Sequence, residues 1–193
     1  MIDTHSHIDA PEFDEDREQA ILRAREAGIE RILVPAISLG SMAGIMDVCR
    51  RHPGYAQPMI GLHPEEVKKG WVEELSKLRQ MLDDNLQNAP ATERFVAIGE
   101  VGLDYYWSRE FADDQLKVFE EQVKWSIETR LPLMIHCRKA QNEMVNMMRK
   151  YIDDLPGGVF HCFTGNLTEA RQLLQFPRFC LGIGGVLTFK KSH

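Results

Sequence analysis

The first residues that could do chemistry are two histidines near the N-terminus, His5 and His7, in the sequence DTHSH. In a strand, side chains two residues apart point to the same face, so both imidazoles can reach one metal ion. Taken alone, the pair fits a solvent-exposed strand end equally well. A position at the mouth of a barrel, where side chains from several strands converge, would favour the metal.

Three more candidates, Glu100, His136 and His161, each follow a short apolar run. A buried carboxylate without a partner is unfavourable because its charge loses solvation. A pair of divalent cations would compensate for this loss, and the alternative partner is an arginine. A single histidine after an apolar run is more often a hydrogen-bonded core residue than a ligand, but two of them together with Glu100 indicate a metal site.

The elements that must position these residues are short apolar runs that alternate with longer amphipathic segments. The β-branched and apolar content of the short runs predicts buried parallel strands, at residues 1–4, 31–37, 57–62, 95–99, 133–135, 158–160 and 179–183. Apolar residues spaced by three or four predict helices over 71–86 and 116–127. We expect Asp14 or Asp16 to begin the first helix and Gly28 to end it.

This alternation predicts an α/β fold, either a doubly wound sheet or a (β/α)8 TIM barrel. Five polar residues are each expected at the carboxyl end of a separate strand, and such ends all meet at one mouth only in a barrel. These residues are His5, His63, Glu100, His136 and His161. The barrel is therefore favoured, as one hydrolase domain over residues 1–193. Because a full barrel needs about 250 residues, we expect it to be truncated after strand seven, without the eighth strand and the last helices.

Composition narrows the function classes. The formal net charge is −6, which argues against binding nucleic acid through a globally basic surface. No apolar run approaches the roughly 20 residues that span a bilayer, so we expect no membrane insertion. The cysteines form no CxxC pair, and the N-terminus does not resemble a signal peptide, which together predict a cytoplasmic protein with free thiols. Strand alternation points Cys137 and Cys162 away from the mouth, as packing residues.

Six motifs, in order along nearly the whole chain, resemble the TatD family of metal-dependent deoxyribonucleases, which have amidohydrolase-like TIM barrels. The motifs are DTHSH at 3–7, GLHP at 61–64, GEVGLDYY at 99–106, PLMIHCRKA at 132–140, VFHCFTG at 159–165 and GIGGVLTFK at 182–190. The family pattern also has a metal-binding aspartate after strand eight. This sequence stops before that motif.

The resemblance implies a ligand set for two divalent metal ions. His5 and His7 would hold one ion together with the missing aspartate, Glu100 would bridge both ions, and His136 with His161 would hold the second. Imidazole and carboxylate ligands suit Zn, Mn or Mg, and they do not choose among these metals.

Other residues are expected beside the metals. His63 would contact or position the substrate phosphate, so that Glu100 and His63 are the expected catalytic residues. Arg138 offers a planar fork to a phosphate, although a surface ion pair is the alternative. Lys190 and Lys191 could meet the nucleic-acid backbone, or they could simply be solvated.

Aromatic residues fall into two groups. Trp71 and Trp125 lie on helical patterns and are expected to pack in the core. Tyr105, Tyr106 and Trp107 follow the glutamate strand, where exposed rings could stack on unpaired bases.

The leading hypothesis is a metal-dependent phosphodiesterase, an exonuclease on single-stranded DNA that uses two metals and a metal-activated water. The expected protein is a monomer, with DNA as substrate and no partner protein inferred. One alternative is amidohydrolase-like cleavage of a C–N or ester bond in a small molecule. That class commonly bridges its metals with a carboxylated lysine, and Glu100 at this position disfavours it. The other alternative is an inactive barrel fragment that binds metal or nucleic acid.

Overall fold

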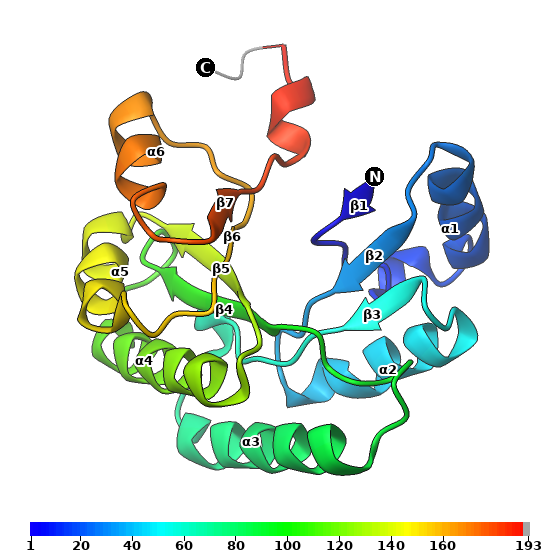
Figure 1. Cartoon of the computed structure of the whole chain (residues 1–193), viewed down its shortest axis with the longest axis horizontal. Helices are drawn as coiled ribbons and strands as arrows, with labels where there is room; N and C mark the ends of the chain where they lie inside the picture. Colours follow the sequence, from blue (N-terminus) through cyan, green and yellow to red (C-terminus); the bar gives the residue numbers. More distant parts are fainter. Residues whose placement is uncertain (191–193) are drawn as a thin grey trace.

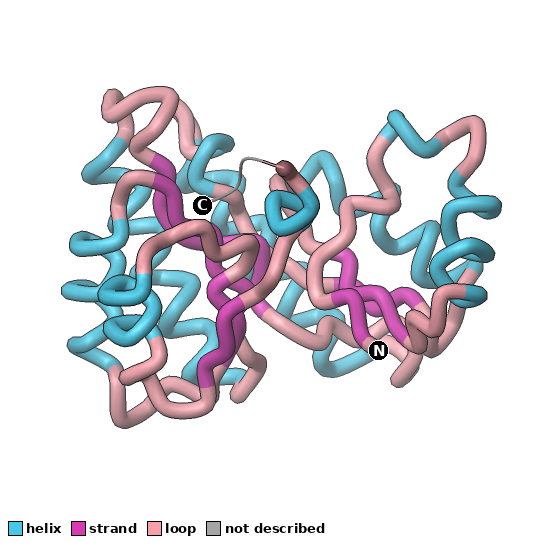
Figure 2. The backbone as a smooth tube through the Cα atoms, turned by 90° about the horizontal axis from the view of Figure 1, so that it is seen from above, coloured by secondary structure: helices cyan, strands magenta, loops and turns pink. Residues whose placement is uncertain are grey.

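The computed structural model describes residues 1–190 of the chain and places strands inside and helices outside (Figures 1 and 2). The strands of the described part are β1 (Ile2–Asp3), β2 (Arg31–Val34), β3 (Ala56–Pro58), β4 (Ile98–Asp104), β5 (Leu133–Arg138), β6 (Gly158–Phe160) and β7 (Phe179–Leu181). The helices are α1 (Arg17–Glu26), α2 (Met42–Arg51), α3 (Trp71–Asn88), α4 (Ala112–Thr129), α5 (Gln141–Met148) and α6 (Leu167–Leu173). This is the expected α/β order.

All strands pair in parallel, in a sheet ordered β1-β2-β3 and a second sheet ordered β4-β5-β6-β7. An isolated bridge between Ile60 and Ile98 joins β3 to β4, and the Gly99 amide donates to the Ile60 carbonyl at 2.8 Å. We call this the closed junction. The largest cluster of buried apolar side chains includes Val34 of β2 and Ile135 of β5, so both sheets share one core.

On the other side, β7 and β1 face each other without strand pairing in the described residues, and we call this the open junction (Figure 1). A cavity of about 630 Å³ lies there, between β1 and the segment that follows β7. The strands therefore curve as a barrel does but do not close one. The expected parallel barrel architecture is confirmed as an open arrangement.

Two strands extend further than their apolar runs predict. Predicted strand 95–99 is observed as β4, which runs through Glu100 to Asp104 with every residue buried. Likewise, β5 continues past His136 to Arg138. The expectation that Glu100 and His136 follow the ends of their strands is therefore wrong. The polar residues that ended the apolar pattern are buried because they face one another.

Gly102 lets β4 and β5 lie close together. Its φ is 140°, and a Cβ there would overlap with the carbonyl oxygen of His136 on β5. Only glycine adopts this conformation without steric cost and lets the two strands pack so closely.

The helical predictions over 71–86 and 116–127 are confirmed as α3 and α4. Asp16 immediately precedes α1, but its side chain makes no cap bond and instead accepts from Arg23. Gly28, with φ of 85°, follows the end of that helix as expected. No helix in the described part is both long and apolar enough to cross a membrane.

Candidate metal centre

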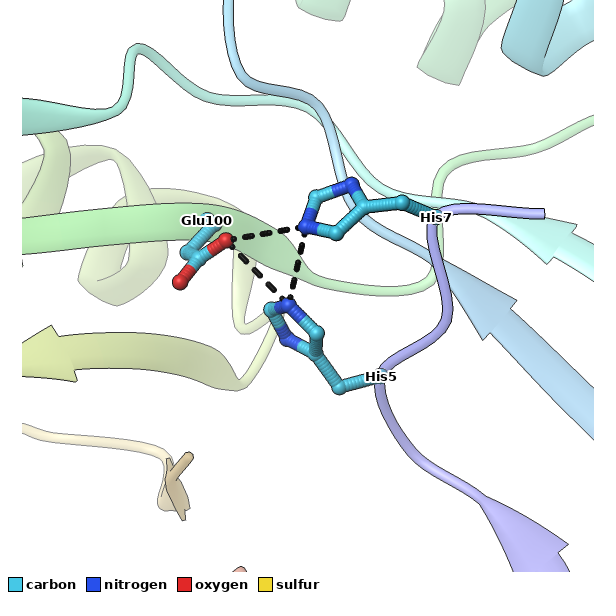
Figure 3. Close-up of side chains that lie close together, drawn as sticks. All are labelled: His5, His7 and Glu100. Atoms are coloured by element: carbon cyan, nitrogen blue, oxygen red, sulfur yellow. Dashed lines mark hydrogen bonds and ion pairs between the residues drawn. The ribbon is translucent and has the colours of Figure 1, made fainter. Parts of the chain in front are cut away.

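The centre of the site is the buried carboxylate of Glu100 on β4, whose side chain is 3% exposed. Its two oxygens face different histidines. Oε2 lies 3.2 Å from Nε2 of His5 and 3.4 Å from Nε2 of His7 (Figure 3). Oε1 lies 3.1 Å from Nδ1 of His136, 3.4 Å from Nε2 of His161 and 3.6 Å from Nε2 of His63. One carboxylate thus faces two groups of imidazoles.

The His5 and His7 group lies in the segment that follows β1. Their Nε2 atoms are 3.1 Å apart, and the Nδ1 of His5 is buried without a hydrogen-bond partner. Two imidazole lone pairs that face each other repel unless a proton or a cation lies between them. The ring of His5 also stacks on that of His161, with centroids 3.6 Å apart, and so the two sides of the open junction meet here.

The His136 side has a partner that the sequence analysis missed. Asp104, at the end of β4 and buried, accepts from Nε2 of His136 at 2.8 Å. This bond occupies Nε2, so Nδ1 is the ring nitrogen that faces Glu100, at 3.1 Å from Oε1. A carboxylate that holds the second nitrogen of a histidine ligand is a recurring feature of metal sites. The GEVGLDYY motif contains Asp104, but its position four residues after Glu100 gave no sign that both are buried.

Two buried glutamines of α4 hold the backbone of the site. The side chain of Gln122 accepts from the Leu62 amide and donates to the Leu62 carbonyl, next to His63. In the same way, Gln115 bonds to both the amide and the carbonyl of Asp104. Their spacing of seven places them on one helix face. Polar residues on the otherwise apolar face of α4 are the sequence signal that could have revealed this role.

The surroundings of Glu100 favour the ionised form of its carboxyl group. Burial acts to raise the pKa of this carboxyl, but hydrogen bonds from the histidines, His136 foremost, lower it well below its usual 4.5. Burial opposes protonation of His136, yet the hydrogen bond and the charge of Glu100 raise its pKa. For His161, burial and the neighbouring His5 lower the pKa to about 4. A lowered pKa of Glu100 next to a raised pKa of His136 is the pattern of a buried carboxylate that needs a positive partner.

The donor set fits a divalent metal. In the described part, three groups have ligand atoms within 4.8 Å of one another, and Glu100 belongs to two of them: His5, His7 and Glu100; His63, Glu100 and His136; and Glu65, Asp104 and His136. None includes a cysteine. Cys137 packs against the core, but it also lines the cavity beside His161 together with Cys162, which lies beyond the end of β6. His161 approaches Glu100 but lies outside these groups.

The other predicted residues are divided by the structure. His63 is close to Glu100 and His136, with its ring centroid 4.5 Å from that of His136. Arg138 is exposed and lines a cavity of about 560 Å³ together with His161. Lys190 is exposed beyond the 3₁₀ turn Gly185–Thr188 and lines neither this cavity nor the one at the open junction. Lys191 lies outside the described residues.

Comparison with known proteins identifies relatives of the whole chain. The family model described as TatD related DNase matches residues 2–193. An uncharacterized metal-dependent hydrolase of Bacillus subtilis, YabD, is 33% identical over 192 residues, which cover 100% of this chain and 71% of that protein. The 3'-5' ssDNA/RNA exonuclease TatD of Cronobacter sakazakii is 33% identical over 185 residues, 96% of this chain and 66% of that protein.

Two solved structures have the same architecture. The TatD homologue YjjV of Escherichia coli superposes with a TM-score of 0.86 and 30% identity, covering 100% of this chain and 71% of that one. A TatD family hydrolase of Entamoeba histolytica gives a TM-score of 0.77 at 22% identity, covering 95% of this chain and 64% of that one. The second likeness concerns the fold alone.

Proposed function

Because the chain belongs to the TatD-related DNase family of metal-dependent hydrolases, we propose that it cleaves phosphodiester bonds of single-stranded DNA from an end, with two divalent ions bridged by Glu100. The observation that carries the proposal is the division of the Glu100 oxygens between two histidine groups. Relatives named 3'-5' ssDNA/RNA exonucleases support the choice of substrate.

In this proposal, His5 and His7 would hold one ion through Nε2, while Nδ1 of His136 and Nε2 of His161 would hold the other. When bound, two such ions, Mg, Mn or Zn, activate a water and stabilise charge on the attacking and leaving oxygens of a phosphodiester. Asp104 keeps the proton of His136 on Nε2 and so leaves Nδ1 free to coordinate.

His63 has a different role in the proposal. Its Nδ1 accepts from the Glu65 amide at 3.2 Å, so in the neutral ring the proton is on Nε2. An Nε2–H group cannot coordinate a metal, but it can donate to a phosphate oxygen. The double hydrogen bond of Gln122 to Leu62 fixes the backbone beside it. His63 therefore orients the substrate phosphate rather than serving as a ligand.

Arg138 is proposed as a second phosphate contact. It lies two residues after His136 on β5, so both side chains are on the same side of the sheet. The guanidinium is exposed at the cavity beside His161 and has no carboxylate partner among the ion pairs of the described residues. A planar fork of this kind suits phosphate oxygens.

The test is cleavage of end-labelled single-stranded DNA by the purified 193-residue chain, with and without added Mg, Mn or Zn. We expect metal-dependent shortening from one end, lost in Glu100→Gln and retained in the control Glu73→Gln, whose carboxylate is exposed and paired with Lys77. RNA of the same sequence measures the preference between the two polymers. Cleavage that continues in chelator, or in Glu100→Gln, would contradict the proposal.

The proposal also includes a cytoplasmic monomer. The cysteines of the described part are free, which suits a reducing compartment. Light scattering of the eluted protein and fractionation of the source cells test these two statements. A stable dimer or an extracytoplasmic protein would contradict them.

A further inference from the structure

An exposed aromatic and cationic cluster lies at the rim of the site, and we propose that it is a stacking platform for the nucleobase next to the scissile phosphate. The platform consists of Tyr106, Trp107 and Arg138. This inference rests on the proposed function, because it assigns a base-binding surface to a phosphodiesterase centre. The occupant is an unpaired base of single-stranded nucleic acid.

The exposure of the platform indicates a binding surface. Tyr106 is 48% and Trp107 is 69% exposed, although both are large rings. Their centroids are 4.8 Å apart in an edge-to-face arrangement, so at most one ring face is covered by the other ring. The Arg138 guanidinium lies 3.6 Å from the Tyr106 centroid and 5.4 Å from that of Trp107. An aromatic and guanidinium surface of this kind is the usual partner of unpaired bases.

The platform is tied to the candidate metal centre by two short connections. Asp104 accepts from the Tyr106 amide through Oδ1 and from His136 through Oδ2, at 2.9 and 2.8 Å. The Tyr105 amide donates to the carbonyl of Arg138 at 2.9 Å. The backbone that carries the platform is therefore held to the same carboxylate and the same strand that position His136.

The cavity beside the platform has the size and lining of a nucleotide site. It measures about 560 Å³ and extends from Tyr106 and Arg138 to His161, next to Glu100. Polar side chains such as Asn142 and Thr164 line the same space. Its volume lies within the range of about 300–1,000 Å³ found for small-molecule pockets. A phosphate at the candidate metals would thus leave its base on the side where the platform lies.

Charge favours the same occupant. The whole chain has a formal charge of −6, so attraction of a polyanion must be local. Arg138 and the adjacent Lys139 are both exposed at this cavity. Glu143 and Glu169 line it too, but Glu143 pairs with Arg109 and Glu169 accepts from the Asn166 amide. This rim therefore offers a single strand both cations, for its phosphates, and aromatic rings, for its bases.

The first arm of the test is binding in chelator, measured by fluorescence anisotropy of labelled oligonucleotides. Two strands differ only at the terminal nucleotide, which has either its base or an abasic tetrahydrofuran. Base–aromatic stacking predicts that the wild type prefers the intact strand by about 5-fold to 100-fold. We expect Trp107→Ala and Tyr106→Ala to bring this ratio close to one, while Trp107→Phe keeps most of it.

Arg138→Ala is expected to reduce the same ratio and to weaken binding of both strands. Its matched control is Arg25→Ala, because Arg25 also lies over a tyrosine, 4.0 Å from the Tyr55 centroid, near the amino end of β3. Parallel strands place that pair at the opposite rim from the platform. The control variant should leave both affinities and their ratio unchanged.

The second arm is metal-dependent hydrolysis of methyl p-nitrophenyl phosphate, a phosphodiester without a base. Absence of this hydrolysis in the wild type would overturn the proposed function and leave the binding ratio to judge the platform. A wild-type binding ratio near one, or an unchanged ratio in Trp107→Ala, would overturn the platform even when the diester is cleaved. Because the ratio compares two strands on one variant, partial loss of folded protein does not alter it.

Discussion

The two junctions between the sheets differ in how they support the site. At the closed junction, β3 and β4 are joined through backbone hydrogen bonds. On this side of the site, Glu100 is part of β4 and His136 is part of the neighbouring β5. At the open junction, β1 and β7 do not pair in the described part, and His5 and His7 lie in the segment after a two-residue strand. The side chain of His7 is 38% exposed, against 17% for His136, whereas His5 is 11% exposed.

Support by neighbouring side chains follows the same division. Asp104 fixes the ring of His136, and Gln122 fixes the backbone beside His63. On the other side, the second ring nitrogen of His5 is buried without a partner. An unpartnered buried nitrogen costs free energy, whereas a held ring is preorganised for its ligand. The comparison indicates that the closed junction provides the more rigid half of the candidate metal centre.

The largest expected effect separates the two halves directly. Removing His136 should weaken binding of the tighter metal ion by more than about a hundredfold, the upper range for loss of an outer partner. Removing His7 should affect chiefly the weaker ion and leave the tighter one nearly unchanged. Calorimetric titration of Mn²⁺ into His136→Ala and His7→Ala measures both. Equal losses in the two variants would mean that the halves do not differ in rigidity.

The second effect concerns Asp104. Asp104→Asn keeps the shape of the side chain but removes the charged acceptor that holds the His136 proton on Nε2. We expect metal affinity and DNA cleavage to fall by about 10-fold to 100-fold. Asp47→Asn is the matched control, because Asp47 is exposed and paired with Arg51. An Asp104→Asn protein that binds metal as tightly as the control would remove this carboxylate from the account.

The third effect is on stability. Gln122 is fully buried and satisfies both polar groups of the Leu62 backbone. Gln122→Leu leaves these groups unpaired, and we expect the free energy of unfolding to fall by about 2 kcal/mol, as measured in urea. The exposed Gln80 on α3 provides the control, since Gln80→Leu should change stability by less than about 0.5 kcal/mol. Similar urea midpoints for both variants would show that the hydrogen bonds of Gln122 to Leu62 do not contribute to stability.

The smallest effect uses thiol chemistry at the two sides of the fold. Cys49 on α2 is buried, and burial raises its pKa to about 12. Cys180 is exposed on β7, at the open junction. At about pH 8, where a free thiol is partly ionised, iodoacetamide should modify Cys180 and spare Cys49 unless the protein is denatured. Mass spectrometry of the tryptic peptides measures both, and rapid labelling of Cys49 would show that α2 opens readily.

Much of this architecture was readable from the sequence. The apolar runs located all the strands of the described part, because buried parallel strands are apolar on both faces. The predicted boundaries of β4 were wrong for a physical reason. Hydropathy ends a strand at Glu100, while the structure buries that charge among histidines that are distant in the chain.

The site could also be predicted only in part. His5 and His7 could be selected by their spacing of two residues, and His136 and His161 because each follows an apolar run. The structure brings all four to Glu100. Asp104 could not be selected, because its role depends on the ring of His136, which reaches it only through the register of β4 and β5. Local patterns report periodicity, whereas contacts between strands depend on pairing.

The central claim is that Glu100 bridges two metal sites, and anomalous diffraction from crystals soaked in Mn²⁺ tests it most directly. We predict two peaks, one at coordination distance from Oε2 with His5 and His7, and one at coordination distance from Oε1 with His136. The peak beside His136 should keep its occupancy at lower Mn²⁺ concentration than the other. A single peak that touches only one oxygen at saturating Mn²⁺, or two peaks that both avoid Glu100, would contradict the account.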